Sequence, residues 1–146
     1  MGTDALAGTG VPDSGRSPRT VEIRQLKVHA DGRGAVFEPL EPELLHGWGN
    51  VHTVITRPGA VRGNHRHLRG TEITTVFGPM LVRYRLDERV EDMNIAAGEA
   101  WRFLFPPGTA HAFKNTGSEP CILVSFNTEV HDAGRPDLER DELITR

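Results

Sequence analysis

The stretch that decides the fold is GAVRGNHRHLRGTE, residues 59–72. His65 and His67 lie two residues apart, and in a β-strand such residues point to the same face of the sheet. Glu72 follows five residues after His67. Glycines bracket the stretch at both ends, as expected for a strand that enters and leaves through turns. We therefore predict that the two imidazoles and the carboxylate face one cavity.

A second stretch, PPGTAHAFKN at residues 106–115, supplies the missing partner. His111 follows a Pro-Pro-Gly turn and begins a segment with strand character. A strand placed beside the first one brings this imidazole to the same cavity. The predicted site is a cavity lined by four candidate ligands: His65, His67, Glu72 and His111.

The rest of the chain predicts an all-β fold. Short segments rich in Val, Ile, Thr and Phe alternate with Gly, Pro, Asn and Asp, which is typical of a sandwich or barrel. Residues 39–49 suit either one helical turn that begins at Pro42 or a loop, and the charged segment 132–146 suits the surface or a neighbouring subunit. The predicted strands are Val21–Val28, Ala35–Phe37, Val51–Arg57, Val61–His67, Glu72–Phe77, Met80–Leu86, Trp101–Phe105, Ala110–Asn115 and Cys121–Asn127.

Length and composition narrow the functional classes. A chain of 146 residues suits one domain, which we place at residues 21–146 after a loose, disordered tail at 1–20 without the features of a targeting peptide. A net charge of -3 argues against nucleic acid, and no apolar run reaches the roughly 18 residues of a membrane span. The single cysteine, Cys121, excludes an internal disulfide and suits a reducing, cytoplasmic compartment.

Three imidazoles and one carboxylate suit a single divalent metal ion. Zn, Fe, Ni, Cu and Mn all accept such ligands, and a set of this kind usually leaves positions for water or substrate. Because no cysteine is among the ligands, an open site is favoured over a closed structural zinc site, with zinc or iron the favoured metals. The remaining histidines are interpreted as surface or structural groups: His29, His46, His52 and His131.

The two stretches resemble the two sequence motifs of the cupin superfamily, whose members fold as a small β jelly roll with the ligands lining the barrel. The first motif matches at Gly59, His65, His67 and Glu72, and the second at Pro106, Gly108, His111 and Asn115. Departures fall in turns: Gly78 comes one residue early, and Ala100 stands where a glycine is expected. The resemblance implies a single-domain cupin jelly-roll barrel.

A closer resemblance covers residues 51–137. RPGAVRGNHRHLRGTE, FPPGTAHAFKNTGSEP and SFNTEVHDAGRPD resemble the cupin domain of capsular polysaccharide nucleotide-sugar epimerases and reductases. More distantly, the segment Arg62 to His65 with PPGTAHAF is similar to deoxysugar 3,5-epimerases and 3,4-ketoisomerases. This resemblance implies an epimerase or isomerase of polysaccharide biosynthesis whose substrate is a nucleotide-linked 4-keto-6-deoxy sugar.

The resemblance to sugar epimerases implies further roles. Arg62, Arg83 or Arg102 would grip phosphate or an enolate, and Asn64 would contact the substrate. Tyr84, the only tyrosine, is a candidate catalytic acid. Because the tyrosine that those epimerases carry after the second motif is absent here, Glu129 is a further catalytic candidate, with His131 as an outside alternative for the proton donor. The metal-free epimerases use the histidine at the position of His65 as a base, whereas the cupin metal motif makes it a ligand. We favour the ligand role.

Two alternative functions stay open. One is a metal cupin that tailors a small carbonyl or phenolic compound as an oxygenase, isomerase or cyclase, since fold does not decide function. The other is a non-catalytic cupin that binds a sugar or another small molecule. In each case a homodimer is expected, because jelly rolls of this size commonly cover exposed sheet edges with a second subunit.

Overall fold

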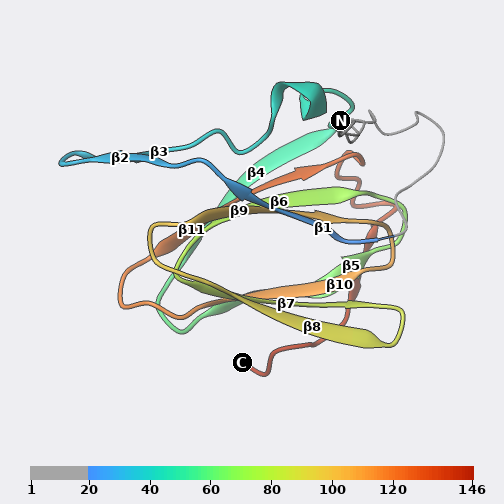
Figure 1. Cartoon of the computed structure of the whole chain (residues 1–146). Helices are drawn as coiled ribbons and strands as arrows, with labels where there is room; N and C mark the ends of the chain where they lie inside the picture. Colours follow the sequence, from blue (N-terminus) through green and yellow to red (C-terminus); the bar gives the residue numbers. More distant parts are fainter. Residues whose placement is uncertain (1–19) are drawn as a thin grey trace, which may run out of the picture.

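The computed structural model describes residues 20–146 as two antiparallel five-stranded sheets that face each other. Figure 1 shows the sheets as two layers, with a two-stranded ribbon that extends away from them. Within the described residues the only helix is a single 3₁₀ turn, so the predicted all-β jelly roll is confirmed. The predicted tail lies outside the described residues, apart from residue 20.

Sheet I has the strand order β1-β9-β6-β11-β4. Its strands are β1 Glu22–Leu26, β4 Asn50–Thr56, β6 Glu72–Phe77, β9 Ala100–Phe105 and β11 Cys121–Asn127. Sheet II has the order β12-β5-β10-β7-β8. Its strands are β5 Val61–His67, β7 Met80–Leu86, β8 Arg89–Ile95, β10 Ala110–Asn115 and β12 Leu138–Arg140. The ribbon pairs β2 His29–Asp31 with β3 Gly34–Val36, and the 3₁₀ turn η1 is Pro42–Leu44.

The core fills the space between the sheets because the strands alternate in side-chain direction. In β7, Met80 and Val82 are fully buried, whereas Arg83 on the opposite face pairs with Asp92 of β8. The main buried cluster combines residues from both sheets. Its members are Val76, Met80, Val82, Ile95, Phe103, Phe105, Phe113, Cys121 and Leu123.

A smaller cluster covers the outer face of sheet I. Ile73 and Leu104 pack there against Leu40, with Trp48 at the margin. The segment 39–49 forms this cover. Of the two alternatives for this segment, the helical turn is the one observed, and it begins at Pro42. Trp48 donates its indole N–H to the Leu44 carbonyl at 2.5 Å, which closes the loop on itself.

Five strands have the bounds that the sequence predicts: β5, β6, β7, β10 and β11. Three short or polar strands were not predicted: β2, β8 and β12. β8 is an edge strand, so one side of its ladder faces solvent and polar residues interrupt the apolar alternation. β12 lies in the charged segment 132–146 and pairs with the edge of β5. Tertiary pairing therefore creates strands that local pattern does not reveal.

Between residues 20 and 146 no helix has the length and apolar character needed to cross a bilayer.

Candidate metal centre

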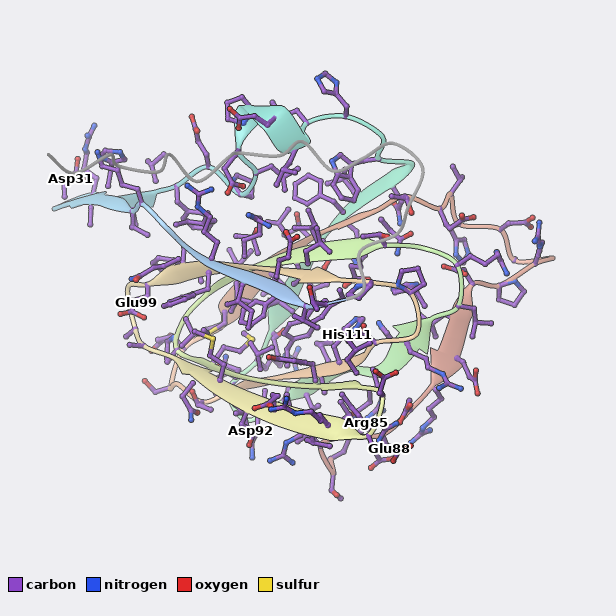
Figure 2. The ribbon with its side chains drawn as sticks, turned by 45° about the vertical axis from the view of Figure 1, so that its right-hand side comes forward. Asp31, Arg85, Glu88, Asp92, Glu99 and His111 are labelled. Carbon is purple, nitrogen blue, oxygen red and sulfur yellow. The ribbon has the colours of Figure 1, made fainter. Side chains whose placement is uncertain are left out.

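Four side chains converge between the two sheets. His65 and His67 come from β5, His111 from β10 and Glu72 from the start of β6. One ligand atom from each residue lies within 4.8 Å of the others. Figure 2 shows His111 in the space between the sheets, while Arg85 and Asp92 lie at the outer side of β7 and β8. Residues that are up to 46 positions apart in sequence thus meet at one point.

A β-bulge aligns β5 with β10. His65 pairs with His111, but the next pair is Gly63 with Ala112, so Asn64 is the extra residue. Gly63 has φ 81°, and a Cβ there would lie 2.7 Å from the His111 carbonyl oxygen. Only glycine suits this close approach without strain. The bulge turns Asn64 outward and leaves Arg62 and His65 on the same inner face.

The imidazole of His111 is held in one tautomer. Its Nδ1 donates to the Thr109 carbonyl at 3.0 Å, and its ring stacks on Phe105 with centroids 4.4 Å apart. The Nε2 atom therefore presents a lone pair. It is buried, and among the residues described it has no hydrogen-bond partner, although Glu72 Oε1 lies 3.3 Å away. Such a buried, unpartnered acceptor is costly unless it binds something.

His67 lies between two carboxylates. Its Nε2 contacts Glu72 Oε2 at 2.5 Å, and its Nδ1 lies 3.5 Å from Asp137 Oδ2. Asp137 also accepts hydrogen bonds from the backbone N–H groups of Arg69 at 2.7 Å and Gly70 at 2.9 Å. A carboxylate behind a histidine fixes the ring and its tautomer, as metal-ligand histidines usually require.

Hydroxyl groups support Glu72 from its other side. Thr74 donates its hydroxyl to Glu72 Oε1 at 2.7 Å, and the Thr74 oxygen lies 2.8 Å from the Ser125 hydroxyl. Because Thr74 uses its only hydrogen on Glu72, Ser125 donates to Thr74. The carboxylate is thereby oriented by a row of hydroxyls on the inner face of sheet I.

The electrostatics of the cluster favour neutral His65 beside ionised Glu72. Burial and the neighbouring His111 lower the pKa of His65 to about 4. Burial works to raise the pKa of Glu72, but His111 and His67 outweigh it and hold that pKa well below its usual value. For His67, burial works to lower the pKa, but Glu72 and Asp137 prevail and raise it. The cluster thus concentrates negative charge where a cation would be bound.

These residues fit a divalent metal ion. Three imidazole nitrogens and a carboxylate oxygen are suitable ligands for zinc, iron, nickel or manganese. The Nε2 atom of His111, which has no hydrogen-bond partner among the described residues, has a lone pair available for the ion. The second ring nitrogens of two of these histidines also have partners: His111 Nδ1 contacts the Thr109 carbonyl, and His67 Nδ1 lies near the Asp137 carboxylate. Such contacts orient the rings of metal-ligand histidines.

A small cavity of about 110 Å³ opens at the cluster. It is much smaller than the roughly 300–1,000 Å³ of typical ligand sites, so it suits the reacting part of a substrate rather than a whole nucleotide sugar. Arg62 is exposed and contributes to the cavity wall. The other wall residues are His52, Val54, Gly63, His65, His67, Glu72, Phe113, Leu123, Ser125 and Leu138.

The other predicted substrate-binding residues are engaged elsewhere. Arg83 pairs with Asp92 at 2.6 Å, and Arg102 is buried against Glu41 at 2.9 Å on the outer side of sheet I. Asn64 is buried and holds the C-terminal segment: its amide donates to the Ile144 carbonyl, and its oxygen accepts the Leu143 and Ile144 N–H groups. The structure brings none of these three side chains into the cavity wall.

The two predicted catalytic groups are both half-buried, and neither is among the residues that line the cavity. Tyr84 pairs across the sheet with His111 and packs against the core, with its ring 6.1 Å from that of Phe105. Burial and Glu91 raise the pKa of its phenol. Glu129 follows β11 and is half-buried, and its backbone N–H donates to the Asn127 side chain.

Two residues near the cluster escaped the sequence analysis. His52 was interpreted as a surface or structural group, yet its side chain lines the cavity. Asp137 backs His67 from the segment that precedes β12. In the sequence, His52 is marked only by its place two residues before Val54, and Asp137 only by its place one residue before β12. Neither place indicates the cavity until the pairing of the strands is known.

Comparison with known proteins places the chain in a sequence family. Residues 29–138 match the polysaccharide biosynthesis C-terminal domain. A probable low-salt glycan biosynthesis epimerase from Haloferax volcanii is 30% identical, over 82% of this chain and 85% of that protein.

Solved structures share the fold. The capsular polysaccharide assembling protein CapF from Staphylococcus aureus has 25% identity and a TM-score of 0.60, over 81% of this chain. This chain spans only 33% of CapF. A mutant of QdtA, a 3,4-ketoisomerase from Thermoanaerobacterium thermosaccharolyticum solved with TDP-4-keto-6-deoxyglucose, has 16% identity and a TM-score of 0.63, over 83% and 87% of the two chains. The chain therefore belongs to the polysaccharide biosynthesis C-terminal domain family, with a cupin-like jelly roll as its fold.

Proposed function

We propose that this protein is a metal-dependent epimerase or isomerase that moves a proton next to the ketone of a nucleotide-linked 4-keto-6-deoxy sugar. The observation that carries the proposal is the cluster of three imidazoles and one carboxylate at a cavity wall that also contains Arg62. The similarity to a probable glycan biosynthesis epimerase and the fold shared with a 3,4-ketoisomerase support this class of reaction.

The reaction needs positive charge at the carbonyl oxygen and groups that remove and return a proton. A bound divalent ion would supply Lewis acidity at that oxygen. His65, His67, Glu72 and His111 would hold the ion, with His65 as a ligand rather than a base. Arg62, the candidate arginine in the cavity wall, would bind phosphate or the developing oxyanion. Because the cavity is small, the nucleotide would lie outside it, on the side where Arg62 is exposed.

The proposal is tested with two measurements on the full chain. Elemental analysis is expected to find about one divalent metal ion per chain. The metal-loaded protein in deuterated water is expected to incorporate deuterium next to the ketone of TDP-4-keto-6-deoxyglucose, as measured by mass spectrometry. Chelation should abolish the exchange, and added metal should restore it.

Other outcomes distinguish the alternatives. A bound metal with no exchange into any nucleotide-linked 4-keto sugar would overturn the proposal. Iron together with oxygen uptake on a phenolic or carbonyl compound would favour a tailoring cupin. Sugar binding without turnover would favour a binding protein. The predicted homodimer is part of the proposal, and light scattering that returned a monomer would remove it.

A further inference from the structure

His52 is a histidine that the metal cluster does not use but that opens onto the same cavity. It lies on β4, the strand at one edge of sheet I. Val54 follows it on the same face and also lines the cavity, which confirms that this face of β4 points inward. His52 therefore approaches the cavity from sheet I, whereas the three ligand imidazoles come from sheet II.

Cross-strand pairing places His52 beside a row of polar side chains that ends at the cluster. His52 pairs across the sheet with Ser125 of β11, and Ser125 pairs with Thr74 of β6. Directly opposed residues in antiparallel strands have Cβ atoms about 4.5–5.5 Å apart, so their side chains are neighbours. Ser125 donates to Thr74, and Thr74 donates to Glu72. Since the Ser125 hydrogen is used in this row, its oxygen remains available to accept one from the His52 ring.

The two catalytic candidates predicted from the sequence, Tyr84 and Glu129, do not line the cavity. Tyr84 packs against the core beside Phe105, and Glu129 belongs to the segment after β11. His52 lines the cavity and is exposed, so it can contact a substrate and also exchange protons with water. Imidazole is the side chain most often used for proton transfer in enzymes.

We propose that His52 is the catalytic residue that removes the proton from the substrate carbon, an inference that rests on the proposed epimerase or isomerase function. Neutral imidazole takes the proton while the electron pair of the C–H bond moves toward the carbonyl oxygen, which leaves an enolate and an imidazolium. A proton from water then adds to the enolate, and the imidazolium releases its proton to water. Atoms and charge balance, and no oxidant or reductant is required.

The test compares His52→Gln and His52→Ala with the wild-type chain, all loaded with metal. We expect deuterium exchange into TDP-4-keto-6-deoxyglucose to fall by about 100-fold or more in kcat, the usual range for loss of a general base. KM, metal content and thermal stability should change little. Added imidazole should restore part of the rate of His52→Ala, which a structural role would not produce. His46→Gln, an exposed histidine outside the cavity, is the matched control.

Each result has a distinct meaning. Exchange by His52→Gln within about twofold of the wild-type rate would overturn the role of His52 and leave the proposed function standing. A loss of metal or of folding in both variants would also overturn it, because it would make His52 a structural residue. No exchange by the wild-type protein would overturn the proposed function and the role of His52 with it.

Discussion

The two ends of the space between the sheets are built by the same strands but have opposite chemistry. At one end β6 contributes Glu72, β10 contributes His111 and β11 contributes Ser125. Farther along, the same strands contribute Val76, Phe113 and Leu123, which belong to the main core, and Phe113 and Leu123 also line the cavity. All six side chains point inward, so strand periodicity alone does not distinguish them.

The two ends therefore serve different purposes, stability at one and ligand binding at the other. The apolar end removes hydrocarbon from water and thereby stabilises the fold. The polar end leaves lone pairs and charges that are costly unless they bind a ligand. Phe105 joins the two ends, because it belongs to the core and stacks on His111. The core therefore supports one face of the His111 ring.

The largest effect is expected from opening the apolar end. Phe103 is fully buried and belongs to the core, and its replacement by alanine should cost about 3–5 kcal/mol of unfolding free energy because it leaves a cavity. Denaturant unfolding measures this loss. Metal affinity of the fraction that remains folded should stay close to wild type. A comparable loss of metal affinity would show that the two ends are not separable.

The next largest effect is expected at the polar end, from His111→Ala or His67→Ala. Each removes one of the four ligands, so metal affinity should fall by about 100-fold or more, together with activity, while the fold persists. Competition with a chromogenic chelator measures the affinity. The exposed His29 on the ribbon provides the control as His29→Ala. Full metal occupancy and an unchanged rate in both ligand variants would reject the site.

Arg62→Ala should change substrate binding rather than folding. A hydrogen bond to a charged group contributes about 1.5–3 kcal/mol, so KM for a nucleotide sugar should rise by about 10-fold to 100-fold. The unfolding free energy should be nearly unchanged, since Arg62 is exposed. Steady-state kinetics with a nucleotide sugar and with the sugar lacking the phosphates tests the role. An equal KM in variant and wild type would contradict it.

The most gradual effect is that of pH on metal affinity. A metal ion requires neutral imidazoles, so protons compete with it. In the metal-free protein the pKa of His67 is raised above 6.5, whereas that of His65 is about 4. As pH falls, His67 is protonated first, and affinity should decrease by about tenfold per pH unit below that pKa. Titrations between pH 8 and pH 5 test this, and a constant affinity across that range would contradict it.

Sequence predicted the elements that build the polar end but not all of their neighbours. β5 and β10 were predicted with their observed bounds, because alternation and flanking glycine and proline residues marked them. β8 and β12 were missed, since an edge strand with one solvated side lacks apolar alternation. His52 and Asp137 were missed for a related reason: only strand pairing places them beside the cluster.

The sequence by itself determined the fold class and the four clustered residues, because residue period and turn chemistry are local properties that motif spacing preserves. The tertiary structure decided which other polar side chains lie at the cavity beside these four residues. Arg62 enters the cavity wall, whereas Arg83 and Arg102 pair with carboxylates on outer faces. The physical reason is that a one-residue bulge or shift of register exchanges the two faces of a strand, and register is set by long-range pairing.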